Sequence, residues 1–247
     1  MTRTKAQYYR VRLSQGQEDV RAAQALRFAV FNLELNEGLT GSFSTGLDAD
    51  RFDAVCDHLL VEELATGAIV GTYRLQTGIR AGENHGYYSA QEFDFAPYET
   101  WRSQIVELGR ACVHRQHRNL VVLGLLWNGI VRYARENKCR YLLGCGSLPA
   151  TDPAVGLRVY EDLKKTSLAT EEWLTLPLAP FSCGVSMPGE GTMKLPKLMA
   201  AYFSLGAKIC GPPAVDHDFK TIDFLTVLDL HALPDSVAGH CSSQPSA

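Results

Sequence analysis

The stretch from Ile105 to Cys145 constrains the fold most, because it has the pattern of a strand, a turn, a helix and a second strand. Apolar residues dominate Ile105 to Val113 and Tyr141 to Cys145, as expected of buried strands. Between them, Leu120 to Asn137 has the apolar spacing of a helix packed on a sheet. This succession predicts an α/β fold.

The remaining chain supplies more strands and helices. On the N-terminal side we expect a strand at Tyr8 to Leu13, a helix at Gln17 to Leu35, and a hairpin of His58 to Glu63 with Ala68 to Leu75. On the C-terminal side we expect helices at Tyr87 to Phe93, Asp152 to Lys165 and Leu195 to Leu205, then a strand at Thr221 to Leu228. The expected fold is one domain over residues 1–233, with a mixed, mostly antiparallel sheet flanked by helices. Residues 234–247 are expected to be a disordered tail.

Composition narrows the class of protein. The 247 residues, 46% of them apolar, suffice for one large α/β core. A net charge of -3 provides no general field for nucleic acid. Seven cysteines without a CxxC pair predict reduced thiols and a cytoplasmic location. The most apolar stretch, Leu120 to Val131, is too short to span a bilayer, so any membrane contact is expected to be peripheral.

A local basic surface follows the strand that ends at Val113. Between positions 114 and 140 the sequence has six basic residues and a single acid, Glu136. The six are Arg115, Arg118, Arg132, Arg135, Lys138 and Arg140. They form either a solvated helix face or a binding surface for an acidic protein or a phosphate.

Glu107 is the candidate general base. Its neighbours Ile105, Val106 and Leu108 would desolvate the carboxylate and raise its pKa. The alternative is a structural ion pair with Arg110. In a regular strand these two side chains face opposite sides, so sharing a site requires a bulge, which Gly109 makes feasible.

A second charged set combines acids with arginines from apolar segments. Arg27 and Arg74 are costly to bury unless carboxylates meet them, and Asp48, Asp50 and Asp53 are the candidate partners. The set is either an ion-pair network that orders residues 37–53 or a pocket for a zwitterionic amino acid.

Other chemistries find little support. Cys112 and Cys145 lie in apolar strands, where cysteine usually behaves as a small hydrophobic residue rather than a nucleophile. His114 and His117 beside Cys112 lack tetrahedral zinc spacing, so no metal site is expected. The sequence has no dinucleotide fingerprint, P-loop or HExxH motif.

These charged residues together resemble a known family. Gln24 to Phe31, Asp48-x-Asp-x-x-Asp53, Gly71-x-x-Arg74 and Glu107-x-x-Arg110 resemble acyl-homoserine-lactone synthases, which have the GNAT-type N-acyltransferase fold. A closer resemblance, over most of the chain, is to ornithine-lipid acyltransferases. It is carried by Phe52 to Val61, Glu107 to His114, Leu126-Trp-x-Gly129, Gly144 to Pro153 and Asp216 to Phe219.

The resemblance implies transfer of a 3-hydroxyacyl group from acyl carrier protein to the α-amine of L-ornithine, giving lyso-ornithine lipid. It implies a catalytic pair, an acceptor pocket and a pantetheine site, without a cofactor of the enzyme's own. The catalytic pair is Glu107 with Arg110, the pocket is Arg27, Asp48, Asp50, Asp53, Arg74 and Ser147, and the pantetheine site is Cys112, Val113, Arg115, Arg118 and Arg132.

The donor and acceptor leave alternatives. GNAT enzymes usually have a glycine-rich turn around the pyrophosphate of coenzyme A, whereas Arg118 to Leu123 is bulky, which favours the carrier protein. Alternative acceptors are glycine, lysine or the substrate of an acyl-homoserine-lactone-type synthase. A non-catalytic acyl-chain or carrier-protein binding module is the alternative outside enzymes.

Overall fold

The computed structural model describes residues 8–184 and 194–233, and the predicted tail from Pro234 onward lies outside them. The chain divides into two compact units. Unit 1 comprises Met1–Gln76 and Leu108–Asn137, and unit 2 comprises Thr77–Glu107 and Lys138–Ala247. Strand β4 (Ile105–Val113) therefore begins in unit 2 and ends in unit 1.

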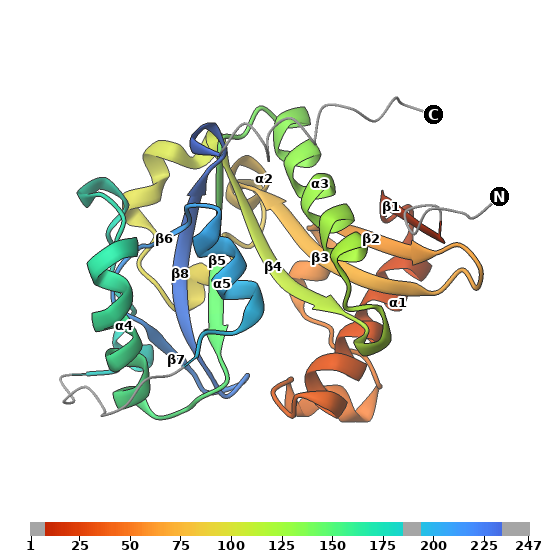
Figure 1. Ribbon diagram of the computed structural model, residues 1–247, viewed down its shortest axis with the longest axis horizontal. Coiled ribbons are helices and arrows are strands. Elements are labelled where there is room, and N and C mark those ends of the chain that lie inside the picture. The colour runs from red at the N-terminus through yellow and green to blue at the C-terminus, as the bar shows by residue number, and fades with distance from the viewer. Residues whose placement is uncertain (1–7, 185–193, 234–247) are drawn as a thin grey trace. The chain divides into compact units, whose positions relative to one another are not determined.

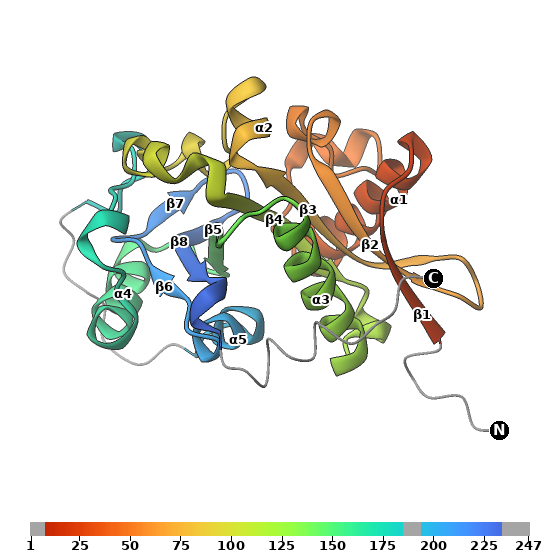
Figure 2. The ribbon, with the colours of Figure 1, turned by 90° about the horizontal axis from the view of Figure 1, so that it is seen from above.

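Unit 1 is an antiparallel arrangement with a helix on each face. Strands β1 (Tyr9–Leu13), β2 (Asp57–Glu63) and β3 (Ile69–Thr77) pair in that order, and β4 follows β3. Helices α1 (Gln17–Phe28) and α3 (Leu120–Glu136) lie on opposite faces of these strands (Figure 2). The predicted strands, hairpin and α3 are confirmed.

The close packing of α3 on the sheet depends on Gly129. A Cβ atom at this position would come within 2.8 Å of the Leu59 side chain and 3.1 Å of the Val11 side chain. Glycine therefore lets the helix approach β1 and β2 at a distance that a larger residue would prevent.

Unit 2 is the mixed part of the sheet. The first residues of β4 pair in parallel with β5 (Tyr141–Leu148), and β5 pairs antiparallel with β8 (Thr221–Asp229). The short strands β6 (Lys208–Ile209) and β7 (Ala214–Asp216) both pair antiparallel with β8. The predicted mixed, mostly antiparallel sheet flanked by helices is confirmed.

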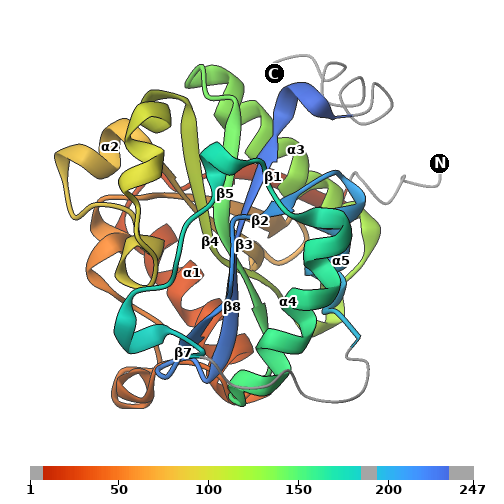
Figure 3. The same cartoon turned by 90° about the vertical axis from the view of Figure 1, so that its left-hand side faces the viewer.

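Alternating residues of β5 and β8 enter two apolar clusters in unit 2. Leu143 and Leu225 belong to the cluster that contains Trp173, whereas Leu148 and Phe224 belong to another. Helices α4 (Pro153–Ser167) and α5 (Lys197–Ser204) cover the second cluster, while residues 77–104, including α2 (Gly78–Glu83), lie on the other face (Figure 3).

The shorter helical turns complete the fold. In chain order the 3-10 helices are η3 (Thr40–Ser44), η4 (Arg51–Ala54), η5 (Ser89–Gln91), η6 (Ala96–Gln104), η7 (Arg115–His117), η8 (Glu171–Trp173), η9 (Ala179–Phe181) and η10 (Leu230–Ala232). No helix in the described ranges is long and apolar enough to cross a membrane (Figure 1).

Three predicted helices differ from the structure. The helix predicted to run to Leu35 changes at Ala29 into the π-helix η2 (Ala29–Glu34), in which Leu35 N–H bonds five residues back to Val30. The helix predicted at Tyr87 to Phe93 is only the turn η5, because the N–H groups at its start bond to the Glu107 side chain. The last helix begins two residues later than predicted, after Pro196 at its N-cap.

Candidate active site

A buried ion-pair network lies between α1 and the loop before β2 in unit 1. Arg27 is 0% exposed, and its guanidinium lies 2.8 Å from an Asp48 carboxylate oxygen and 2.6 Å from an Asp53 carboxylate oxygen. Arg27 also donates to the backbone carbonyl of Asp48. The arginine on the apolar helix is therefore neutralised by two carboxylates, as burial of a charge requires.

Two further arginines extend this network. Arg74 contacts Asp53 at 3.0 Å and Asp50 at 2.6 Å, and Arg110 contacts Asp50 at 3.0 Å and Asp48 at 3.4 Å. Asp50 also caps η4 by accepting the N–H of Phe52. The acids predicted to meet Arg27 and Arg74 do so, and Arg110 joins the same network.

Sequence reasoning missed two members of the network. Gln24 donates to the Asp53 carboxylate at 2.8 Å, and His58 Nε2 donates to the Asp53 carbonyl at 3.1 Å. Gln24 lies one helical turn before Arg27, and His58 lies directly opposite Arg74 in the β2–β3 register. Helical spacing and strand pairing could therefore have indicated both residues as members of the network. Burial is the main cause that lowers the pKa of His58, which favours the neutral imidazole.

The network predicts a specific acid sensitivity. Burial alone would raise the pKa of Asp53, but the charge and hydrogen bond of Arg27 outweigh it, and the pKa lies well below its ordinary value. A lowered folded pKa stabilises the protein above the unfolded value of about 4, and that stabilisation is lost as the pH falls toward the folded value. We expect urea unfolding between pH 5 and about pH 3 to show a shallower pH slope in Asp53→Asn than in the wild type. Equal slopes would contradict this assignment.

The expected irregularity in β4 occurs at Arg110 rather than at Gly109. Arg110 has φ +51°, a left-handed conformation that costs a non-glycine residue about 1 to 3 kcal/mol. The ion pairs of Arg110 with Asp48 and Asp50 stabilise this conformation. The strand is therefore distorted at the residue that carries the charge.

Glu107 lies in unit 2 and is held by backbone donors. It is 4% exposed, and its two carboxylate oxygens accept the N–H groups of Tyr88 and Ser89, each at 2.8 Å. These donors stabilise an ionised carboxylate. The Glu107 side chain is buried, as expected, but backbone N–H groups of the turn η5 compensate the charge of its carboxylate.

A cluster of three titratable residues in unit 2 was not predicted from the sequence. The potential ligand atoms of Glu92, Cys145 and Asp223 all lie within 4.8 Å of one another, a grouping that could hold a cation. Burial, followed by the charge of Glu92, raises the pKa of the Cys145 thiol well above its ordinary value, so the thiol is protonated. Ser147, predicted to bind the acceptor, is exposed on β5 and pairs in register with Asp223.

The residues predicted to bind the donor differ in their surroundings. Cys112 is buried against Leu26 and Val30, and burial raises the pKa of its thiol to about 12. Arg118 forms two hydrogen bonds to the Glu34 carboxylate, at 2.6 and 2.9 Å, and donates to the Val113 carbonyl. Arg118 is therefore engaged by the protein.

Arg115 and Arg132 offer a more accessible charge. Arg115 is exposed on η7, and Arg132 is exposed on α3 with its nearest carboxylate, that of Glu136, at 3.9 Å. Such a long surface pair leaves the guanidinium available to solvent or a partner.

Comparison with known proteins identifies the class. Residues 26–128 match the family model described as an acetyltransferase (GNAT) domain. The crystal structure of the AHL synthase LasI has the same fold, with a TM-score of 0.52 and 12% identity over 97% of this chain and 98% of that chain. The chain thus has the fold of the GNAT acyltransferases.

Two relatives are similar over almost the whole chain. The L-ornithine N(alpha)-acyltransferase of Agrobacterium fabrum is 34% identical over 90% of this chain and 81% of its own length. The protein of the same name from Brucella abortus is 33% identical over 90% of this chain and 85% of its own length. The chain belongs to the L-ornithine N(alpha)-acyltransferase family.

Proposed function

We propose that this protein transfers a long-chain 3-hydroxyacyl group from acyl carrier protein to the α-amine of L-ornithine and so forms lyso-ornithine lipid. The observation that supports this most is its similarity, along nine tenths of the chain, to relatives named for acylation of that amine. The buried carboxylate Glu107 supplies the base that the reaction needs.

Glu107 acts as the general base, directly or through a water molecule. Each carboxylate oxygen accepts one backbone N–H, so the turn η5 fixes the position of the carboxylate. In the proposed reaction this carboxylate takes the proton of the α-ammonium group. In the same proposal, backbone N–H groups near Cys112 and Val113 stabilise the tetrahedral oxyanion.

The charged network orders the acceptor pocket. Arg27 and Asp48 are fully buried and form an ion pair with one another, so their role is to hold the loop in place. Asp50 and Arg110 are the more exposed members and are the ones that contact the amino acid. Acceptor binding by Ser147 stays a prediction from the resemblance.

The donor is acyl carrier protein rather than coenzyme A. At the start of α3 the Asn119 side chain accepts the N–H groups of both Val121 and Val122. These first-turn donors are the groups that bind a pyrophosphate in a helix N-terminal cradle. Since they are already engaged, the single phosphodiester of a carrier-protein arm suits the site better.

We expect Arg115→Glu combined with Arg132→Glu to raise the KM for acyl carrier protein by about tenfold or more, with a strong dependence on ionic strength. A short acyl-pantetheine donor should be used as well as by the wild type. The matched control is Arg158→Glu, because Arg158 is a partly exposed arginine on α4 in unit 2. An equal loss with both donors, or efficient turnover with coenzyme A thioesters and none with the carrier protein, contradicts the donor assignment.

A further inference from the structure

We propose that unit 1 carries a membrane-docking surface formed by the end of the π-helix η2, the turn η3 and the first turn of α3. The surface, here called the apolar edge, consists of Leu33, Leu35, Phe43, Leu120 and Leu123, with Arg115 at its rim. Its occupant is a lipid bilayer that contains anionic headgroups. The inference rests on the proposed function for its purpose and is tested without turnover.

The apolar edge is unusual in its exposure. Leu120 is 87% exposed, Leu33 64% and Phe43 59%. Five of the ten exposed large apolar side chains in the described chain belong to it. Single exposed leucines are ordinary, but a concentration of them marks an interaction site.

Specific contacts bring the three segments together. The two hydrogen bonds from Arg118 to Glu34 join the start of α3 to η2, so Leu33 and Leu35 flank a residue tied to the segment that precedes Leu120. On the other side, the Asn32 amide donates to the Leu39 carbonyl and holds the loop that leads into η3. The apolar edge is therefore built from segments of unit 1 that these contacts join to one another.

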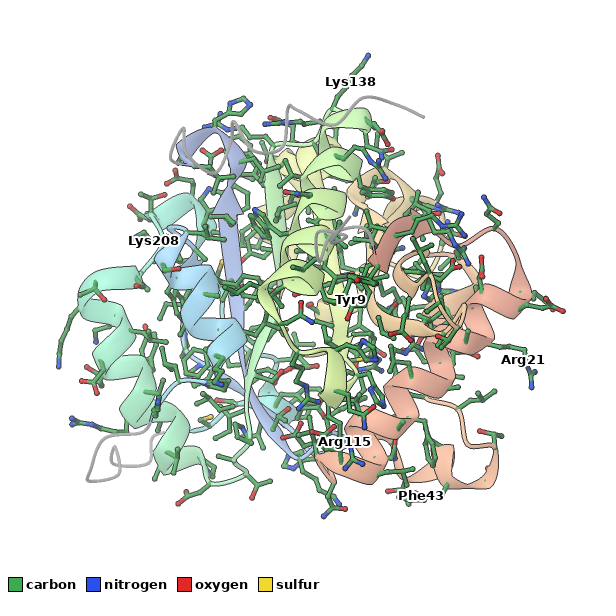
Figure 4. The ribbon with its side chains drawn as sticks, turned by 45° about the vertical axis from the view of Figure 1, so that its right-hand side comes forward. Tyr9, Arg21, Phe43, Arg115, Lys138 and Lys208 are labelled. Atoms are coloured by element: carbon green, nitrogen blue, oxygen red, sulfur yellow. The ribbon has the colours of Figure 1, made fainter. Side chains whose placement is uncertain are left out.

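The turn η3 and the turn η7, which carries Arg115, lie at the same end of unit 1. The Phe43 ring packs edge-on against Phe28, with ring centroids 5.5 Å apart, which fixes its position. In the view of Figure 4, the labelled Phe43 and Arg115 are both drawn toward the bottom of the molecule. A cationic side chain therefore accompanies the apolar ones.

The balance of charge favours lipid over an acidic protein. The Arg118 and Glu34 charges cancel in their ion pair, and burial raises the pKa of Glu37 above its ordinary value. Arg115 forms no ion pair with any residue in the described ranges. An almost neutral apolar face with one cation at its rim suits the boundary between headgroups and acyl chains. The five apolar side chains themselves offer little to a strongly acidic protein, because its recognition depends on charge and is assigned in the proposed function to Arg115 and Arg132.

The proposed reaction gives this surface a purpose. The product has one acyl chain and a charged headgroup, so it is an amphiphile that leaves water for a bilayer. An enzyme docked on the membrane releases such a product where it is stable.

The test measures binding to vesicles by flotation. We expect the wild type to bind vesicles of phosphatidylcholine with phosphatidylglycerol, and less strongly vesicles of phosphatidylcholine alone. The triple variant Leu33→Ser, Phe43→Ser and Leu120→Ser should bind at least about tenfold more weakly, because it removes most of the apolar area that docking on the bilayer would bury. The matched control, Leu64→Ser with Leu176→Ser, changes exposed leucines outside the apolar edge and should bind like the wild type.

A reporter variant tests docking through a gain of signal rather than through a loss of binding. In Leu120→Trp, vesicles with brominated acyl chains should quench fluorescence beyond the quenching seen for the wild type. The proposal is overturned if the wild type does not float with vesicles, if the triple variant binds equally well, or if the control loses as much. It is also overturned if the triple variant keeps vesicle binding but no longer uses acyl carrier protein. A failure to acylate ornithine leaves the vesicle result unchanged and points to the proposed function instead.

Discussion

Glu107→Gln is expected to lower kcat for acylation of L-ornithine by about 10²-fold or more, the scale on which general-base catalysis contributes. The amide cannot accept the proton, and its NH₂ group would face the N–H of Tyr88 or Ser89 where a carboxylate oxygen now accepts. Steady-state kinetics with a saturating donor measure the loss.

The control separates the loss of a base from a loss of folding. Glu99→Gln removes an exposed carboxylate in unit 2 that pairs with Arg102, and it should keep the wild-type kcat. Thermal unfolding of Glu107→Gln should remain cooperative. A folded Glu107→Gln protein with unchanged turnover would remove Glu107 from the mechanism.

Arg27→Met is expected to destabilise the protein by about 3 to 5 kcal/mol, the usual result of removing one partner from a buried ion pair. The methionine fills much of the space of the arginine stem but leaves the Asp48 and Asp53 carboxylates without their shared cation. Urea unfolding at pH 7 measures the change in the free energy of unfolding.

The comparison for this variant is Arg10→Met. Arg10 also bonds to a carboxylate, that of Glu62 at 2.9 Å, but its side chain is 57% exposed. An exposed pair contributes about 1 kcal/mol or less. Similar losses for the two variants would show that burial does not govern the network.

Much of the fold could be predicted because its signals are local. The apolar run of β4, the helical spacing of α3 and the turn at Ala65 to Gly67 each identify an element without knowledge of its neighbours. The charged network could be predicted for a different reason. A buried arginine requires carboxylates, and the chain offers three of them close together just before β2.

What sequence reasoning missed depends on tertiary contacts. Nothing local at Tyr87 to Phe93 indicates that Glu107 takes its first N–H groups and leaves only the short turn η5. The left-handed conformation of Arg110 follows from ion pairs with residues far away in sequence. Glu92, Cys145 and Asp223 come from three separate segments, so only the folded chain brings them together.

Mass spectrometry of the lipid extract from a host that expresses only this chain tests the central proposal most directly. We predict a new amphiphile with the mass of L-ornithine joined by one amide bond to a 3-hydroxyacyl chain, and its absence when the expressed chain carries Glu107→Gln. Fragmentation should place the acyl group on the α-amine. A new product built on glycine, lysine or a homoserine lactone, or an unchanged lipid extract despite abundant folded protein, would contradict the account.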